Sequence, residues 1–414
     1  MTMHADRAGR PDRGEFHGHK LLVLSAVIGL TTSMNAVMIY SLGSFIGPLN
    51  AEFGWDRGSI SLAVSVLTFG VFLFGPVAGQ LCDRFGAAAV GALSLLAYGA
   101  AVIAMTVLVS DLTGFLIAYF LIAMLGVGST PIVLVRPITA GFDKRRGLAL
   151  GIALTGAGLA GFWVPNAVTE ASASFGWRAG YWVVAVAAML AAPIVWFGFR
   201  PSERRAAAAA PTDRAEIGMT LAEARKTRAF WSATILAVTM ALGVGGMIVH
   251  LIPLFNDLGA DARTAARMAS IIGIASAVGR LLIGASLDRF PAPLVATVVI
   301  GMGAVGIALL GFGGLSYGIV SVILIGLLLG AELDLLAYMA SRLFGQKAFG
   351  AIYGWLYSMY SIGFGLSPFL IGRSRDSFGS YDFALIGSVA FLALAAIAVQ
   401  GLRVSTPREP IGAL

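Results

Sequence analysis

Long apolar runs dominate this sequence, and short polar segments separate them. Each run holds about 20 or more residues, the length at which an α-helix crosses the hydrocarbon core of a bilayer. Lipid offers the backbone no hydrogen-bond partners, so helices are the structure that we expect for these runs. The predicted spans are 19–47, 58–82, 87–109, 112–140, 147–172, 178–199, 229–256, 264–287, 292–313, 315–341, 349–372 and 382–402. The sequence therefore predicts an all-α membrane protein with 12 transmembrane helices.

Charged side chains are too few for a soluble domain. They make up 12% of the 414 residues, whereas soluble domains carry about 25%. The net charge of +7 comes from basic residues in the short segments, so we expect no nucleic-acid partner. The single cysteine, Cys82, excludes an intramolecular disulfide and a cysteine-cluster metal site. Residues 1–18 are polar and basic without an apolar core, so no cleavable signal peptide is expected.

The distribution of Lys and Arg predicts how the chain lies in the membrane. Of the 28 basic residues, 20 lie in the termini and the even-numbered connections, and six lie in the odd-numbered connections. Because basic residues gather on the cytoplasmic side, both termini and the long connector over residues 200–228 are expected in the cytoplasm. That connector divides the chain into an N-terminal six-helix bundle (1–199) and a C-terminal one (229–414). We expect a functional monomer in the cell membrane.

The two halves of the chain repeat one another. The segment GQLCDRF at 79–85 follows the second span, and the related segment GASLDRF at 284–290 follows the eighth, 205 residues later. Four residues between Lys144 and Pro165 recur between Lys347 and Pro368 at an offset of 203. Internal symmetry of this kind is typical of transporters that bind their substrate between two similar bundles, near the middle of the membrane.

Arg280 is a charged residue deep inside an otherwise uncharged span. It lies about 12 Å from Asp288, where water is expected, at 1.5 Å per helical residue. An arginine at this depth costs at least about 2.5–3.5 kcal/mol, so we expect it to face a cavity or a partner. Its neighbours on the helix surface are all small, which leaves room for another helix or for a ligand: Gly273, Ser276, Ala277 and Gly284.

Two interpretations of Arg280 stay open. The arginine can be held permanently by a carboxylate on a neighbouring helix, or it can bind an anion in a transport pathway. We favour the second interpretation, because Gly75 stands at the equivalent place in the first half and the charge thus belongs to one half alone.

The six-plus-six layout and the segment GQLCDRFG at 79–86 resemble the major facilitator superfamily, whose second and third helices are joined by G-x-L-x-D-R-x-G. The resemblance covers nearly the whole chain and implies a transporter fold of two pseudo-symmetric bundles. The pairs Asp83–Arg84 and Asp288–Arg289 stand at equivalent helix ends in the two halves. We expect these pairs to act in gating and not in the choice of substrate.

Within that superfamily the sequence is most similar to monocarboxylate transporters. The similar segments are FDKRRGLALGIALTGAGLAG at 142–161 and the region from Glu52 to Ser61. The resemblance implies that an arginine on the eighth helix holds the substrate carboxylate, and Arg280 matches that position. The acidic motif of that family's first helix is absent, and Asn35 is the polar residue in the corresponding span. We therefore do not expect the first span of this chain to have the proton-coupling role of that motif.

Two acids in the tenth span, Glu332 and Asp334, are candidates for proton coupling. Successive helical residues turn by about 100°, so the two carboxyls point to different sides. Asp334 heads a polar stripe that includes Tyr338, whereas Glu332 lies on an apolar stripe. Asp334 is thus the preferred proton site and Glu332 the second choice. The alternative is permanent pairing of both acids with Arg136 and Arg280.

Three further residues inside spans carry polar groups: Arg136, His250 and Tyr357. Arg136 lies near the cytoplasmic end of its span. Its side chain can contact the substrate there or extend towards water. His250 lies in the outer half of its span and fits hydrogen bonding at an outer gate as well as proton transfer. Tyr357 belongs to a stripe with Tyr353 and Tyr360; such a stripe is more often helix packing, although it would suit an aromatic acid.

The function that we favour from the sequence is transport of a small carboxylate by proton symport. Arg280 would bind the carboxylate, and Asn35, Ser276 and Tyr338 would complete the substrate site. The sequence has no phosphate loop, metal-ligand cluster or nucleophile–base pair, so we expect no enzymatic activity, metal or cofactor. An anion exchanger of the oxalate–formate type, which needs no proton, is the alternative. A non-transporting membrane sensor is a weaker one, because the termini and the connector offer no signalling domain.

Overall fold

Helices coincide with all twelve predicted spans in the computed structural model, which describes residues 19–142, 146–207, 218–287, 289–345 and 347–402. The first half contains α1 (Lys20–Thr31), α2 (Met34–Phe53), α3 (Arg57–Phe85), α4 (Ala87–Leu108), α5 (Leu112–Gly126), η1 (Val127–Ser129), α6 (Pro131–Leu134), α7 (Arg136–Gly141), α8 (Arg146–Phe175) and α9 (Trp177–Ala207). The second half contains α10 (Leu221–Ala224), α11 (Arg228–Asp257), α12 (Ala262–Leu287), α13 (Ala292–Gly313), η2 (Gly314–Tyr317), α14 (Gly318–Phe344), α15 (Phe349–Phe378) and α16 (Asp382–Gln400).

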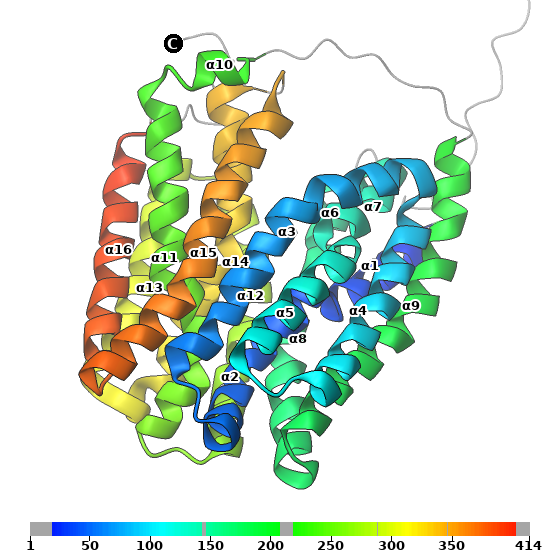
Figure 1. Cartoon of the computed structure of the whole chain (residues 1–414). Helices are drawn as coiled ribbons and strands as arrows, with labels where there is room; N and C mark the ends of the chain where they lie inside the picture. The colour runs from blue at the N-terminus through cyan, green and yellow to red at the C-terminus, as the bar shows by residue number, and fades with distance from the viewer. Residues whose placement is uncertain (1–18, 143–145, 208–217, 288, 346, 403–414) are drawn as a thin grey trace, which may run out of the picture.

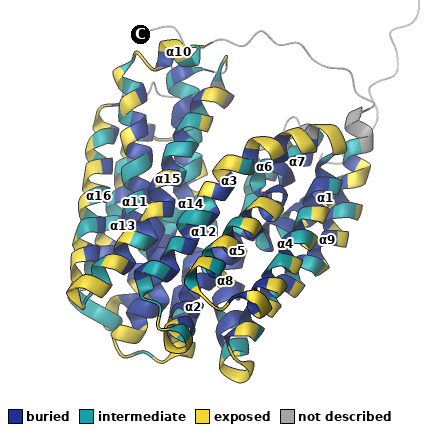
Figure 2. Cartoon of the chain, in the orientation of Figure 1, coloured by how far each residue is buried: buried dark blue, intermediate teal, exposed yellow. Residues whose placement is uncertain are grey.

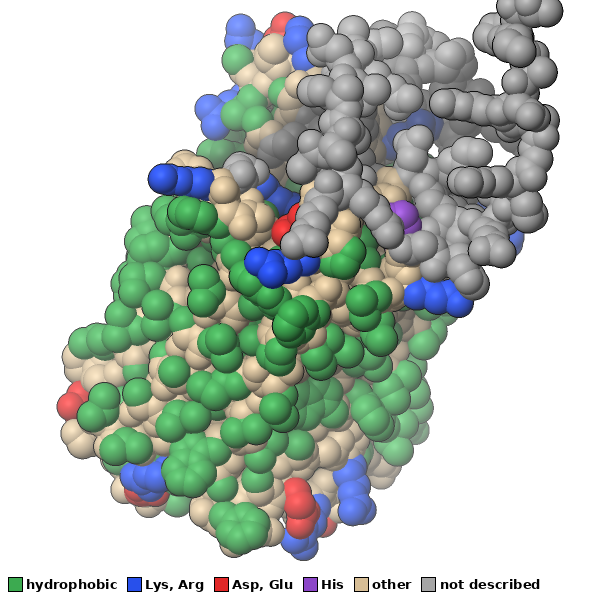
Figure 3. Space-filling model, turned by 90° about the vertical axis from the view of Figure 1, so that its right-hand side faces the viewer, with side chains coloured by type: hydrophobic (Ala, Val, Ile, Leu, Met, Phe, Trp, Pro, Cys, Tyr) green, Lys and Arg blue, Asp and Glu red, His purple; other side chains and the backbone are tan. Residues whose placement is uncertain are grey.

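The outer surface of the molecule fits a lipid environment. Ten helical segments among the described residues are long and apolar enough to cross a membrane; one of them, Ala292–Phe344, contains both α13 and α14, and α15 is not among the ten. Figure 2 shows exposed residues along the outward-facing helices, and many of the exposed residues are large and hydrophobic, such as Leu93, Leu190 and Ile397. Figure 3 shows hydrophobic side chains over the middle of the molecule and charged side chains towards its two ends. These observations confirm the predicted all-α membrane fold.

Two helical bundles lie side by side in Figure 1, with α1–α9 in one and α11–α16 in the other. Most of the contact between them lies in three helix pairs: α3 with α15, α8 with α12, and α2 with α11. We call the end of the molecule that bears α10 the connector end, and the opposite end, where α3 begins and α11 ends, the far end. At the connector end, α9 continues to Ala207, beyond the predicted end of its span at residue 199.

The first predicted span is broken between α1 and α2, whereas the sequence predicts one continuous helix. Thr32 and Ser33 interrupt it, and their hydroxyls donate to the preceding carbonyls of Ile28 and Leu30, respectively. Ser and Thr side chains compete in this way with backbone hydrogen bonding. Ser33 itself is extended, with φ −62° and ψ 143°. The freed carbonyl of Thr32 accepts a hydrogen bond from the Tyr98 hydroxyl on α4.

The fourth predicted span is also broken, into α5, η1, α6 and α7. Pro131 and Pro137 lack a backbone N–H and restrict the residue before them, which ends each helical turn there. This break packs directly on the first one, because the Ser129 hydroxyl accepts a hydrogen bond of 3.0 Å from the Met34 backbone N–H. The break in the fourth span thus supplies a hydrogen-bond acceptor to the break in the first, as interrupted helices inside a membrane require.

The connector half of the molecule contains open space beside three helices, whereas the middle is tightly packed. A Cβ at Gly273 of α12 would overlap the backbone of α8 at Gly158 and Gly161, so the bundles touch there without intervening side chains. Towards the connector end, a Cβ at Gly151, Gly284 or Gly354 would have no atom of the described residues within 4 Å. The ribbons of the two bundles also diverge in this direction (Figure 1).

Candidate functional site

The deep arginine of α12 forms an ion pair with an acid of α14. Arg280 Nη1 lies 2.9 Å from Asp334 Oδ1, and the two side chains are 14% and 32% exposed. The two helices approach closely because Gly330 of α14 has no side chain. A Cβ at that position would overlap the backbone carbonyl of Ser276. Asp334 and Arg280 each lie four residues after that contact, which is one helical turn, so the contact brings their side chains together.

The small residues around Arg280 mostly accommodate neighbouring helices. Gly273 and Ala277 pack against α8, and buried Ser276 packs against α14. At Gly284, one turn beyond Arg280, no described residue fills the space. From the sequence, the space beside Arg280 could accommodate either another helix or a ligand. The structure places helices on one side of Arg280 and open space on the side towards the connector end.

A second acid lies nearby in a different environment. Glu332 is completely buried, and its Oε2 accepts a hydrogen bond of 2.6 Å from the Tyr360 hydroxyl of α15. Its other oxygen, Oε1, has no hydrogen-bond partner among the described residues. Burying an unpaired carboxylate costs several kcal/mol. A protonated Glu332 therefore fits this position better than an ionised one.

Tyr40 of α2 is a residue of this region that the sequence analysis missed. It interacts electrostatically with both Arg280 and Glu332, although it belongs to the other bundle. Asn35, the residue predicted for that side, lies half-buried in the first turn of α2. Tyr40 is the single tyrosine of its predicted span, which is a signal that could have pointed to it.

The remaining predicted residues lie further from the ion pair or at its edge. The Tyr338 hydroxyl donates to the carbonyl of Leu287 at the end of α12, at 3.2 Å. Arg136 begins α7, and its Nη2 lies 3.5 Å from the place of a Cβ at Gly79 of α3. Tyr357 is half-buried on α15, next to Tyr360.

The predicted gating pairs fall partly outside the described structure. Asp288 and the side chain of Asp83 are not among the described parts. The Arg84 side chain is exposed, and its guanidinium lies 5.1 Å from the centre of the Phe85 ring. Arg289 is also exposed. The gating role of these pairs therefore stays a prediction.

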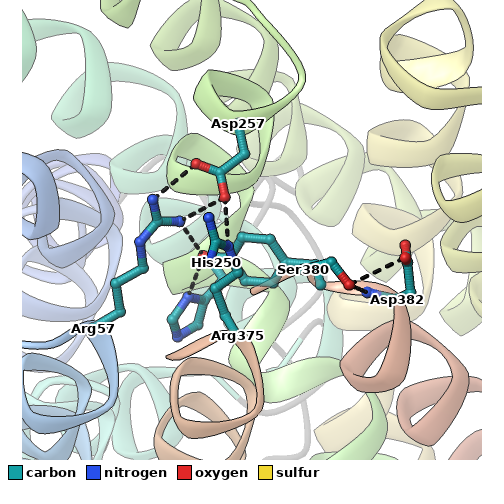
Figure 4. Close-up of polar contacts among 7 residues, drawn as sticks. Arg57, His250, Asp257, Arg375, Ser380 and Asp382 are labelled. Atoms are coloured by element: carbon teal, nitrogen blue, oxygen red, sulfur yellow. Dashed lines mark hydrogen bonds and ion pairs between the residues drawn. The ribbon is translucent and has the colours of Figure 1, made fainter. Parts of the chain in front are cut away.

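The far end holds a network of polar contacts between the bundles, shown in Figure 4. Arg57 of α3 donates to both carboxylate oxygens of Asp257 on α11, at 2.8 and 3.0 Å. Asp257 also accepts a hydrogen bond of 2.7 Å from Arg375 Nε of α15. A more exposed pair, Glu170 of α8 with Arg263 of α12, joins the bundles nearby at 2.8 Å. The bundles are therefore held closed at this end.

His250 lies buried at the base of this far-end network. Arg57 donates to the Tyr381 hydroxyl at 2.9 Å, and that hydroxyl lies 3.1 Å from His250 Nδ1. Burial raises the pKa of Tyr381 to about 12, so its hydroxyl stays protonated and can donate a hydrogen bond to Nδ1. The other ring nitrogen, Nε2, lies 2.8 Å from the Pro368 carbonyl, which can only accept. His250 is thus a neutral ring with its proton on Nε2, a hydrogen-bonding member of the closed end.

The sequence model of the Major Facilitator Superfamily matches residues 28–368. Human "Monocarboxylate transporter 11" is 27% identical, and the match covers 94% of this chain and 83% of that protein. "MFS-type transporter pytF" of Aspergillus terreus is 28% identical, with 69% of this chain and 93% of that protein covered.

Among solved structures, a bacterial homologue of the human lysosomal transporter Spinster, crystallised in an inward-facing and occupied conformation, shares the fold. Its TM-score is 0.67 at 17% sequence identity, over 95% of this chain and 97% of that one.

Proposed function

This chain belongs to the Major Facilitator Superfamily of membrane transporters, and we propose that it moves a small organic anion with a carboxylate group by proton symport. The transport would proceed by alternating access across the cell membrane. The observation that supports this most is the Arg280–Asp334 pair on facing helices, with unfilled space one helical turn further along α12, at Gly284. The low-identity similarity to proteins named monocarboxylate transporters supports the same class of substrate.

The proposed chemistry is an exchange of partners at Arg280. A guanidinium binds a carboxylate through two parallel charge-assisted hydrogen bonds, and a substrate carboxylate would take the place of Asp334. The released Asp334 would then lack its counter-charge in a site of low polarity, which favours uptake of a proton. Binding of substrate and proton would strengthen one another by the same factor. Glu332, which has no ion pair among the described residues, is the second choice for the proton site.

The conformational part of the proposal uses the two bundles as rigid units. Residues 1–199 and 229–414 would rock against one another, with residues 200–228 as the link between them. By the distribution of basic residues, the connector end is the cytoplasmic one and both termini lie there. The described state would then be closed to the outside and open to the cytoplasm. Asn35, Ser276 and Tyr338 remain proposed contacts of the substrate, and Arg136, His250 and Tyr357 possible ones.

Uptake into proteoliposomes tests the coupling. Asp334→Asn is expected to abolish accumulation driven by a pH gradient and to spare counterflow, which moves labelled substrate without net proton transport. Glu332→Gln is the matched comparison on the same helix. If accumulation persists in Asp334→Asn and is lost in Glu332→Gln, Glu332 takes the role. If both variants still accumulate substrate, the protein is not a proton symporter of this kind, and exchange becomes the better account.

A further inference from the structure

A row of aromatic rings runs along one face of α15. It consists of Tyr353, Tyr357, Tyr360 and Phe364, at helical spacings of four, three and four residues. The ring centres are 6.3, 6.4 and 5.7 Å apart in order. These distances lie within the range of interacting aromatic pairs. The row is thus one continuous aromatic surface, in a helix whose other faces carry mostly small residues and aliphatic side chains.

The connector-side part of this aromatic row lies beside the Arg280–Asp334 pair. Tyr353 interacts electrostatically with both Arg280 and Asp334, and it is half-buried. Tyr357 is half-buried as well, whereas Tyr360 and Phe364 are only 7% and 9% exposed. The two rings on the open side of the molecule therefore keep surface that a bound molecule could cover. Open space also lies next to Tyr353 on its own helix, at Gly354.

The other bundle presents a tyrosine to the same region. Tyr40 of α2 interacts electrostatically with Arg280, Glu332 and Tyr360. Its ring is held against α8, where a Cβ at Gly161 would lie 2.8 Å from its Cε1. Glycine at 161 therefore leaves the space that the Tyr40 ring occupies. Aromatic side chains of both bundles thus stand around Arg280.

We infer that the acid bound at Arg280 is an aromatic monocarboxylate, with its carboxylate on the guanidinium and its ring against Tyr353 and Tyr357. This inference rests on the proposed function and adds the substrate class. Stacking of two aromatic rings is favourable beyond the area that they bury. The site combines one cation, Arg280, with the aromatic rings of Tyr353 and Tyr357. It therefore matches a ligand that has a carboxylate at one end and an aromatic ring at the other. A short hydroxy acid would leave those faces uncovered.

The test compares acids that carry an aromatic ring, a saturated ring or no ring. Phenylacetate and cyclohexylacetate have the same chain and a six-membered ring, and acetate lacks the ring. Competition of each acid against labelled phenylacetate counterflow gives their relative affinities. Wild-type protein should bind phenylacetate several-fold more tightly than cyclohexylacetate, and both more tightly than acetate. Tyr353→Leu and Tyr357→Leu should each reduce the preference for the aromatic ring by about 2- to 12-fold, as expected for one stacking pair.

Matched variants separate stacking from other effects. Tyr353→Phe and Tyr357→Phe keep the rings and should keep the preference. Tyr317→Leu removes an exposed tyrosine of η2, far along the chain from this site, and should change nothing. Equal affinity for phenylacetate and cyclohexylacetate in wild type, or an unchanged preference in both leucine variants, would overturn the inference. If all three acids bind equally and still require Arg280, the proposed carboxylate transport stands without the aromatic class. If no acid depends on Arg280, both proposals fail.

Discussion

Replacing Asp257 by asparagine should loosen the closed far end of the transporter. The Asp257 carboxylate receives Arg57 from the other bundle and Arg375 from its own. The neutral amide would keep the size of the side chain but would leave the two guanidinium groups close together without their shared anion. The bundles should therefore separate more often at this end.

The size of the effect follows from the geometry of the Arg57–Asp257 pair. The contact is bidentate, and the two side chains are 24% and 26% exposed. Exposed ion pairs contribute about 0.2–1 kcal/mol, and charge-assisted bidentate contacts are about twice as strong as neutral ones. A loss of about 1–2 kcal/mol would shift the equilibrium towards the far-open form by about 5- to 30-fold.

A cysteine at Ser61 can report this equilibrium. Ser61 is completely buried beside His250 at the bundle boundary, so it should become reachable when the far end opens. In a Cys82→Ala background, Ser61→Cys is labelled from outside the cell with a membrane-impermeant maleimide. Asp257→Asn should raise the labelling rate by the factor given above. Glu170→Gln removes the more exposed cross-bundle pair, with side chains 58% and 56% exposed, and should have a smaller effect. A labelling rate that Asp257→Asn leaves unchanged, or that both variants raise equally, would refute the reasoning.

Two further predictions concern packing, and thermal unfolding of the purified protein in detergent checks both. Gly273→Ala should destabilise the protein by about 1–3 kcal/mol, because its Cβ would overlap the α8 backbone. Gly284→Ala on the same helix, with open space around it, should not lower the unfolding temperature, because alanine favours the helix and meets no neighbour. Equal loss in both variants would argue against the close contact. Ser129→Ala should cost about 1–3 kcal/mol, because the Met34 backbone N–H at the break in the first span would lose its acceptor. The control for Ser129→Ala is Ser358→Ala, which removes an exposed hydroxyl of α15. A Ser129→Ala variant as stable as wild type would contradict the role given to the hydrogen bond from Met34.

The sequence predicted the positions of the twelve helical spans, because an apolar run of membrane length leaves the backbone no choice other than a helix. It also placed Asp334 on a polar stripe of its helix, and the structure puts that residue against Arg280. The breaks at Thr32 and Ser129 were not predicted. They depend on hydroxyls and on Tyr98, which supply hydrogen bonds from segments far apart in the chain.

The far-end network could not be predicted from single helices either. Arg57 and Asp257 are 200 residues apart, and each alone looks like an ordinary charge at the end of a span. Tyr40 was missed for a related reason, because its proximity to Arg280 depends on how α2 packs on α8. The internal repeat indicated that two bundles face one another, but it did not indicate which side chains meet between them.

The central claim is that Arg280 binds the substrate carboxylate, and equilibrium binding of a labelled carboxylate to purified Arg280→Lys protein tests it most directly. Lysine keeps the positive charge but lacks the planar fork that matches a carboxylate. We expect affinity to fall by about tenfold or more, the equivalent of about 1.4 kcal/mol or more. Arg200→Lys, a change of the same kind at an exposed position of α9, should bind as wild type does. Wild-type affinity in correctly folded Arg280→Lys protein would contradict the claim.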